Sequence, residues 1–324
     1  MDLSVIIVNW NVEEYLRRCL SSLWAEKQRK PGLAMEVVVI DNASKDNSCA
    51  MVVEEFRWVR LISNEENRGF TAACNQGIAV SQGRYILLLN PDTEVMENSL
   101  SMMVEYMGRH RDVAALGPKL LNPDGTVQSS RRRFPSMATA LVESTPLQRW
   151  LSKLPMLSKF YCKDMSDDEV QDVDWLVGAC LMMRQEILTE VGPLDERFFM
   201  YSEEMDWCYR AKAVGWRVVY IPSAKVVHHY GRSSAQDMLR RNIYFNESKW
   251  KFFAKHHGSI AGGLLRRYLL GMYLFQFLEE GAKLALGHKR ALRRERLALI
   301  NGVLRSRLRT DSTGSTRRPG SLQA

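Results

Sequence analysis

One aspartate of the sequence lies where a metal ligand is expected, at the end of an apolar segment. Asp92 closes the run Asn90-Pro91-Asp92, which directly follows Tyr85–Leu89. The proline stiffens this turn, so the carboxylate is held at the end of the predicted strand. A hard cation bound there could bridge the carboxylate to a diphosphate. The same residues also suit a tight turn that caps the next helix, so both interpretations stay open.

Two further segments could contact a nucleotide or another anion. Asp41 follows the apolar segment Glu36–Ile40 and could accept hydrogen bonds from a base or a ribose, although Asp-Asn-Ala-Ser is also ordinary helix-capping sequence. Asn67-Arg68-Gly69 places a cation and a glycine that permits close approach beside a predicted helix N-terminus, where an anion is favoured. The alternative for this segment is a loop with a solvated arginine.

Three acids lie within four positions of the predicted helix Tyr201–Ala213. Glu203, Glu204 and Asp206 are close enough for each charge to disfavour ionisation of the others. One of them could therefore have the raised pKa that suits a general base for a hydroxyl group. The alternative is a solvated acidic first turn that complements the helix dipole.

A histidine follows a later apolar segment. His228 ends the predicted strand Lys225–His228, where a neutral imidazole could bind a metal. A strand-end histidine without a ligand is the alternative.

The elements that position these residues follow from hydrophobic periodicity. Leu3–Val8 and Glu36–Ile40 are short apolar runs, as expected for strands buried on both faces of a parallel sheet. The segment between them, Glu13–Trp24, has helical spacing, and the alternation continues to residue 89. The predicted class is α/β, with a doubly wound, mostly parallel sheet. Ligands bind at the carboxyl ends of such strands, where Asn9 and the polar residues above would gather.

The remaining sequence predicts a helical appendage. We expect a catalytic domain over 1–240 with a poorly patterned insertion at 143–170, a basic helical extension over 241–310, and a disordered tail over 311–324. The net charge is +8, yet residues 259–324 alone hold 13 Lys and Arg against 4 Asp and Glu. The basic character therefore belongs to the C-terminal part and not to the predicted domain.

The C-terminal extension is predicted to lie on an anionic membrane surface without spanning it. Six apolar residues recur there at helical spacing: Leu264, Leu265, Tyr268, Leu269, Met272 and Tyr273. The run Tyr268–Leu278 is almost wholly apolar but has only eleven residues, whereas a spanning helix needs about 20. Cations flank this run: Arg266, Arg267, Lys283, Lys289, Arg290, Arg293, Arg294 and Arg296. This arrangement is typical of an interfacial helix. The alternative is a helix pair that packs on the catalytic domain or on a second subunit, as in a homodimer.

The cysteines and the N-terminus indicate the compartment. The six cysteines occur singly, without the spacing of a zinc or redox site, and are expected to be core thiols. The first residues, Met1-Asp2-Leu3-Ser4, contain no basic leader. We therefore expect a cytoplasmic protein, peripheral at the inner face of the cell membrane.

Taken in order, these motifs resemble those of the inverting family 2 glycosyltransferases of GT-A fold, within the bacterial rhamnosyltransferase-type branch. The resemblance extends over about residues 3–235 and depends on the order of the strand-end motifs, since each motif alone is weakly specific. It implies transfer of a sugar, in this branch rhamnose, from a nucleotide diphosphate donor to a glycan or lipid-linked saccharide during cell-surface polysaccharide synthesis. It also implies a divalent cofactor, Mg²⁺ or Mn²⁺.

The resemblance implies a role for each motif. Asp41 would contact the nucleobase, and Asp92 with His228 would hold the metal, with Asn90 where the family usually has an acid. Glu204 would be the catalytic base, with Glu203 and Asp206 beside it. Donor contacts are implied for Asn9, Asn67, Arg68, Gly69 and Arg210, and Trp175 with Gly178 would shape the acceptor side. Arg131–Arg133 could meet anionic groups of donor or acceptor, or form a solvated loop.

Other functions fit the sequence less well. A sugar-1-phosphate nucleotidyltransferase would have a glycine-rich basic loop after its first strand, which Asn9-Trp10-Asn11 does not provide. The basic tail could bind nucleic acid, but its arginines alternate with leucines in helical order, so no nucleic-acid partner is expected. A family member that binds the nucleotide sugar without catalysis is a third alternative.

Overall fold

A computed structural model describes residues 1–229, 231 and 236–309, and the tail predicted for 311–324 lies outside them. The chain divides into two compact units. Unit 1 comprises Met1–Phe134, Ser158–Arg197 and Glu203–Ser233. Unit 2 comprises Pro135–Leu157, Phe198–Ser202 and Ser234–Ala324.

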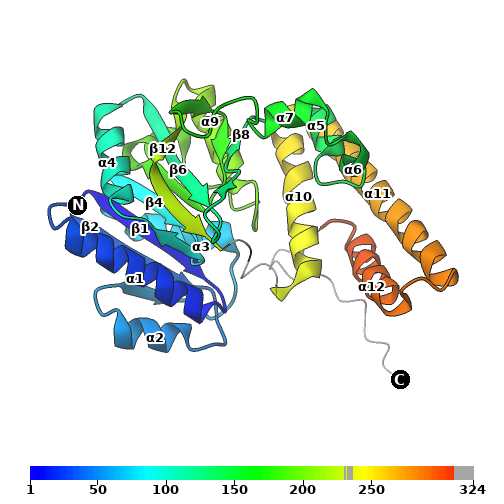
Figure 1. The fold of residues 1–324 in the computed structure, drawn as a ribbon, viewed down its shortest axis with the longest axis horizontal. Coiled ribbons are helices and arrows are strands. Elements are labelled where there is room, and N and C mark those ends of the chain that lie inside the picture. The colour runs from blue at the N-terminus through cyan, green and yellow to red at the C-terminus, as the bar shows by residue number, and fades with distance from the viewer. Residues whose placement is uncertain (230, 232–235, 310–324) are drawn as a thin grey trace. The chain divides into compact units, whose positions relative to one another are not determined.

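Unit 1 is built on a mixed sheet (Figure 1). Its strands are β1 (Leu3–Asn9), β2 (Met35–Asp41), β3 (Arg60–Ser63), β4 (Tyr85–Leu89), β5 (Thr93–Val95), β6 (Val113–Leu121), β7 (Val127–Gln128), β9 (Gln171–Val173), β11 (Cys180–Arg184) and β12 (Arg217–His228). Their order is β3-β2-β1-β4-β11-β6-β12-β5, with β7 beside β6 and β9 beside β12. The pairs among β1 to β4 and the pair β6–β12 are parallel, whereas β11 is antiparallel to both its neighbours. The predicted class is confirmed.

Helices cover both faces of this sheet. They are α1 (Glu13–Arg29), α2 (Ser48–Glu55), α3 (Phe70–Val80), α4 (Ser99–Arg109), α8 (Leu188–Val191) and α9 (Glu203–Ala213), with a 3₁₀ turn at Gln185–Ile187. Alternate β1 side chains enter two separate cores: Val5 packs with residues of α1, α2 and α4, and Ile6 with residues of α3 and α9. Burial on both faces explains why the strand sequences are continuously apolar.

Unit 1 also contains a small ladder beside the main sheet. In it β8 (Arg131–Arg132) pairs antiparallel with β10 (Trp175–Leu176), and Trp175 lies opposite Arg132. The two halves predicted as separate strands, Arg217–Ile221 and Lys225–His228, form the single strand β12, with an irregularity between Ile221 and Lys225.

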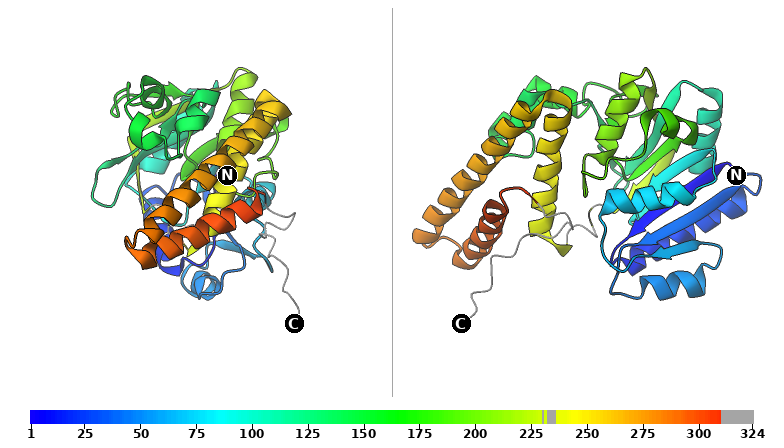
Figure 2. Two further views of the ribbon diagram at one scale, coloured as in Figure 1. Left: turned by 90° about the vertical axis from the view of Figure 1, so that its right-hand side faces the viewer. Right: turned by 180° about the vertical axis from the view of Figure 1, so that it is seen from behind.

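Unit 2 is helical (Figure 2). Its helices are α5 (Met137–Val142), α6 (Gln148–Leu151), α10 (Met238–His257), α11 (Ser259–Ala285) and α12 (Arg290–Ser306); α7 (Pro155–Phe160) crosses the boundary to unit 1. Gly258, with φ of 92°, separates α10 from α11. A Cβ on Gly262 would lie 2.4 Å from the Cβ of Ala254, so the two helices are in close backbone contact.

Unit 2 includes three segments of the domain predicted over 1–240. Residues 135–157, 198–202 and 234–240 belong to the same compact unit as the C-terminal helices. The Tyr268 hydroxyl donates to the Leu141 carbonyl at 2.8 Å, and buried Lys249 donates to the Glu143 carbonyl at 2.6 Å. These long-range contacts join weakly patterned segments, so hydrophobic periodicity did not reveal them.

Candidate active site

The ends of β1 and β2 carry the first predicted site residues and hold them together. Asn9 and Asp41 are register partners, and Asn9 Nδ2 donates to Asp41 Oδ1 at 2.8 Å. The other carboxylate oxygen of Asp41 accepts from the Ser44 amide at 2.8 Å. Ser44 Oγ accepts from Asn9 Nδ2 and from the Asn11 amide, which closes the network. Asp41 is thereby fixed at the carboxyl edge of the sheet.

Asn42 links this edge to the segment before α3 and is a residue that the sequence analysis missed. Its Nδ2 donates to the Gly69 carbonyl at 3.0 Å, while its Oδ1 accepts from Asn64 and from the Arg68 amide. Asn67 accepts from the Gly69 amide, and Gly69 has φ of 87°, which glycine adopts without strain. The Arg68 side chain is exposed. The position of Asn42 directly after a predicted strand-end acid was the available signal.

Asp92 and His228 lie together at the ends of the β4–β5 turn and of β12. His228 Nε2 is 3.3 Å from Asp92 Oδ1, and both side chains are buried. Gln128 directs its Nε2 to Asn122 Oδ1 and to the His228 carbonyl, so its Oε1 is the acceptor that faces His228 Nδ1 at 2.6 Å. The imidazole therefore carries a proton on Nδ1 and presents Nε2 to the carboxylate.

Glu204 lies in the first turn of α9 beside the turn between β10 and β11. Its Oε1 accepts from the Gly178 amide at 3.3 Å. Burial raises the pKa of the Glu204 carboxyl, and backbone hydrogen bonds and the charge of Arg132 counteract part of that rise. Burial and the neighbouring Glu204 and Asp206 charges raise the pKa of Glu203 still more. In the described part of the chain, neither Glu203 Oε2 nor Glu204 Oε2 has a hydrogen-bond partner.

Backbone pairing places Glu204 near the Asn90-Pro91-Asp92 turn. The Asn90 amide donates to the Ala179 carbonyl at 2.9 Å, and Ala179 follows the Gly178 that contacts Glu204. Antiparallel β11 makes this connection, because Cys180 is the register partner of Leu89. The base candidate and the metal-ligand candidate thus belong to one edge of the sheet.

Asp206 and Arg210 are engaged in local structure. Asp206 is fully buried and accepts from Arg210 Nε at 2.9 Å. Arg210 also donates to the carbonyls of Val191 and Pro193, which ties α9 to the turn after α8. These contacts hold Asp206 and Arg210 within α9 and against the turn after α8, and the roles predicted for them beside the base and at the donor stay predictions.

The β8–β10 ladder separates the arginines predicted as a group. Arg131 is buried, donates to the Ser166 carbonyl and to Gln171 Oε1, and pairs with Asp167. Arg132 points to the other face, where its guanidinium lies 4.7 Å from the ring centroid of Tyr161. Trp175, opposite Arg132, is partly buried and donates through Nε1 to the Arg133 carbonyl at 3.1 Å. Trp175 is thus the register partner of Arg132, whose positive charge lowers the pKa of the Glu204 carboxyl.

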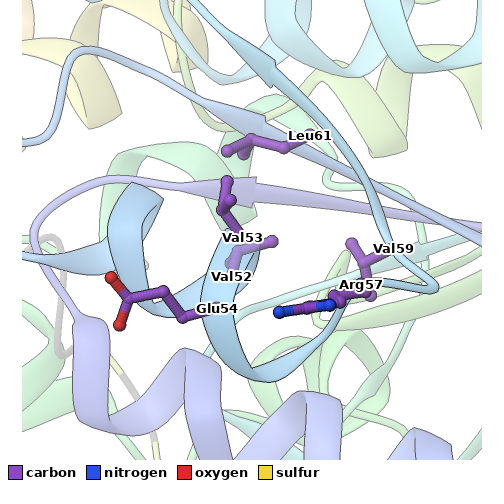
Figure 3. Close-up of a pocket in the computed structure, with 6 residues that line it drawn as sticks. All are labelled: Val52, Val53, Glu54, Arg57, Val59 and Leu61. Atoms are coloured by element: carbon purple, nitrogen blue, oxygen red, sulfur yellow. The ribbon is translucent and has the colours of Figure 1, made fainter.

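A surface hollow elsewhere in unit 1 is apolar and has a volume of about 530 Å³ (Figure 3). Its lining residues are Val52, Val53, Glu54, Arg57, Val59 and Leu61. None of the predicted site residues lines it. Among the described residues, no group of three or more His, Cys, Asp or Glu side chains is arranged to hold a metal ion.

Sequence comparison identifies the class of protein to which this sheet and its strand-end site belong. Residues 4–192 match the model of the family described as glycosyl transferase family 2. The chain belongs to this family and is a glycosyltransferase, as the resemblance implied.

Two relatives support membership of the rhamnosyltransferase-type branch of this family. The chain is 30% identical to the N-acetylglucosaminyl-diphospho-decaprenol L-rhamnosyltransferase of Mycobacterium tuberculosis over 93% of this chain and 98% of the relative. It is 24% identical to rhamnosyltransferase WbbL of Escherichia coli K12 over 78% of this chain and 92% of the relative.

Solved structures share the fold. GalNAc-T7 with UDP, GalNAc and Mn²⁺ superposes with a TM-score of 0.54 at 19% identity, covering 78% of this chain and 50% of that chain. The mannosyltransferase PcManGT of Pyrobaculum calidifontis, with GDP-Man and Mn²⁺, has a TM-score of 0.51 at 15% identity, covering 93% and 86%. The GT-A class is thereby confirmed.

Proposed function

We propose that this glycosyltransferase moves rhamnose from a nucleoside diphosphate donor to a lipid-linked saccharide in cell-surface polysaccharide synthesis, with inversion at the anomeric carbon. The rhamnosyltransferase relative from M. tuberculosis, aligned over almost its whole length, supports the sugar and the kind of acceptor. The observation that carries the chemistry is the position of Glu204, a carboxyl of raised pKa at the edge where Asp92 lies.

The donor nucleotide would occupy the edge formed by β1, β2 and the segment before α3. Asp41, held by Asn9 and Ser44, presents its fixed carboxylate toward the base or ribose. Gly69 allows the diphosphate close to the N-terminus of α3, where anions are favoured, and Arg68 adds an exposed positive charge. Asn67 shapes this turn, and Asn90 would approach the donor from β4.

The pair Asp92 and His228 fits a divalent cation such as Mg²⁺ or Mn²⁺. Gln128 Oε1 faces His228 Nδ1, and His228 Nε2 is directed at Asp92 Oδ1, 3.3 Å away. An imidazole nitrogen and a carboxylate oxygen this close together could bind one cation. With two ligands from the protein, the remaining coordination positions of the cation would be open to the donor phosphates. A bound cation would stabilise the departing diphosphate.

Glu204 would act as the general base. It accepts the proton of the acceptor hydroxyl, whose oxygen attacks the anomeric carbon opposite the departing nucleoside diphosphate. One such displacement inverts the configuration. Trp175 offers an aromatic face to the acceptor sugar, and Gly178 leaves room beside the base.

The lipid of the acceptor would place this reaction at a membrane. We include in the proposal that the protein works at the cytoplasmic face of the cell membrane as a peripheral enzyme. In the described residues no helix has both the length and the apolar character required to cross a bilayer. A homodimer and the absence of nucleic-acid partners stay predictions.

A donor screen tests this function. Purified protein is offered dTDP-, UDP- and GDP-sugars with Mg²⁺ and Mn²⁺ supplied separately, and nucleoside diphosphate release is measured with and without a diphosphate-linked N-acetylglucosamine acceptor. We expect acceptor-dependent turnover with a deoxyhexose donor. Glu204→Gln should bind the donor but lose about 100-fold in turnover, the scale of a lost general base, whereas Glu203→Gln retains more. Donor binding without turnover in the wild type would favour a non-catalytic homologue.

A further inference from the structure

The helix α11 has one apolar face that is not covered by the described parts of unit 2. Five large apolar side chains on it and that of Leu286, directly after its last residue, are between 48% and 85% exposed: Ile260, Leu264, Leu274, Phe275, Leu278 and Leu286. At 3.6 residues per turn they fall within an arc of about 120°, over a length of about 39 Å. We call these six residues the α11 stripe.

The opposite face of α11 packs against the other helices of unit 2. Figures 1 and 2 show α10 and α12 on the same side of α11. Leu265 and Leu269 are buried, and the Tyr273 hydroxyl accepts from Asn246 of α10 at 3.0 Å. Of the six residues predicted from their helical spacing, only Leu264 belongs to the stripe, and Leu265 and Leu269 are used in helix packing. Leu274, Phe275 and Leu278 of the stripe lie in the predicted apolar run Tyr268–Leu278.

Charge at the stripe is positive. Arg267 lies within the same arc, and exposed Lys289 and Arg290 lie at the start of α12, after Leu286. The two acids of α11 are both neutralised within the unit. Glu279 pairs with Lys283 and with Arg149, and Glu280 pairs with buried Arg293 at 2.7 Å.

An exposed tryptophan lies next to this helix. Trp150 is 66% exposed, and the neighbouring Arg149 reaches Glu279 of α11 at 3.7 Å. Tryptophan and arginine are favoured at the boundary between lipid headgroups and acyl chains. A second copy of this chain would meet the stripe with the same exposed cations, whereas an anionic lipid surface complements them.

We propose that the α11 stripe docks the protein on an anionic lipid bilayer, with the helix lying in the membrane plane. The proposal deepens the proposed function, since it brings the sheet unit to an acceptor whose lipid is embedded in that bilayer. The apolar side chains enter the headgroup region, and Arg267, Lys289 and Arg290 contact anionic headgroups.

Vesicle flotation of the full-length protein tests the surface. The vesicles contain phosphatidylcholine with phosphatidylglycerol, or phosphatidylcholine alone. We expect wild type to float with the anionic vesicles only. The triple variant Leu274→Gln, Phe275→Gln, Leu278→Gln should lose at least about tenfold in bound fraction, because three exposed apolar side chains no longer enter the bilayer. Circular dichroism confirms that it remains folded.

A matched control replaces three exposed valines of unit 1, Val53→Gln, Val170→Gln and Val214→Gln, and should float like wild type. Transfer to a water-soluble short-chain acceptor is measured in parallel and should be equal in all three proteins, which separates docking from catalysis. Equal flotation of the triple variant and wild type would overturn the proposal. It would equally be overturned by a wild-type dimer that ignores vesicles and dissociates in the triple variant.

Discussion

Two opposing effects set the pKa of the Glu204 carboxyl. Burial raises the pKa of its carboxyl, while the Gly178 amide and the positive charge of Arg132 lower it. A general base works only when deprotonated, so turnover falls as the pH drops through this pKa. Glu203, whose pKa is raised well above the ordinary value, holds its proton over a wider range and keeps negative charge at the site low.

Removal of Arg132 should therefore move the acid side of the pH profile. In Arg132→Gln the carboxylate of Glu204 loses a stabilising cation, so its pKa rises and the fall in kcat at low pH begins at a higher pH. The shift is measured in kcat, which reports the pKa of the enzyme with substrate bound. Arg133→Gln is the matched control, since Arg133 pairs with Asp164 at 3.1 Å. A shift toward lower pH in Arg132→Gln, or equal shifts in both variants, would contradict the assignment of Glu204.

At the scale of elements, the strands nearest the N-terminus are the best predicted part of the molecule. Leu3–Val8 and Glu36–Ile40 are continuous apolar runs because β1 and β2 are covered on both faces, and their polar ends Asn9 and Asp41 follow from that pattern. The contact of Glu204 with Gly178 was not predictable in the same way. It depends on antiparallel β11 entering between β4 and β6, a pairing that local periodicity does not encode.

Helix α11 contains two adjacent glycines, of which one is packed tightly against α10 and the other has open space beside it. A Cβ on Gly262 would lie 2.7 Å from the Cα of Ala254, whereas a Cβ on Gly263 meets nothing within 4 Å. Gly262→Ala should force α10 and α11 apart and destabilise unit 2 by about 1–3 kcal/mol. Gly263→Ala should be neutral or stabilising by up to about 1 kcal/mol, because alanine is the better helix former.

Hydrogen exchange of α10 and α11 amides checks this pair of variants, since it reports unit 2 without requiring the whole chain to unfold in one step. Faster exchange in Gly262→Ala and slower or unchanged exchange in Gly263→Ala is expected. Identical exchange in the two variants would show that the helices adjust without cost and that the close contact at Gly262 has no energetic weight.

On the scale of the whole chain, charge and apolar surface are distributed unequally. Residues 259–324 hold 13 Lys and Arg against 4 Asp and Glu, a net +9 that exceeds the +8 of the whole chain, and the α11 stripe lies in the same segment. Truncation after Gly258 would not isolate this feature. It would also remove the helices that cover α10 and α5, where Tyr268 contacts Leu141 and Arg266 lies 5.6 Å from the Trp250 ring centroid.

Salt provides a test that leaves the chain intact. The Debye length falls from about 30 Å at 0.01 M to about 3 Å at 1 M ionic strength, so attraction between exposed cations and an anionic bilayer is screened strongly as salt rises. With a long-chain acceptor in anionic vesicles, we expect the KM for the acceptor to rise about tenfold or more between low and high salt. With a water-soluble short-chain acceptor, the KM should change far less, because the site at the sheet edge does not depend on the bilayer. Parallel salt dependence for the two acceptors would place the effect in the active site and not in the C-terminal helices.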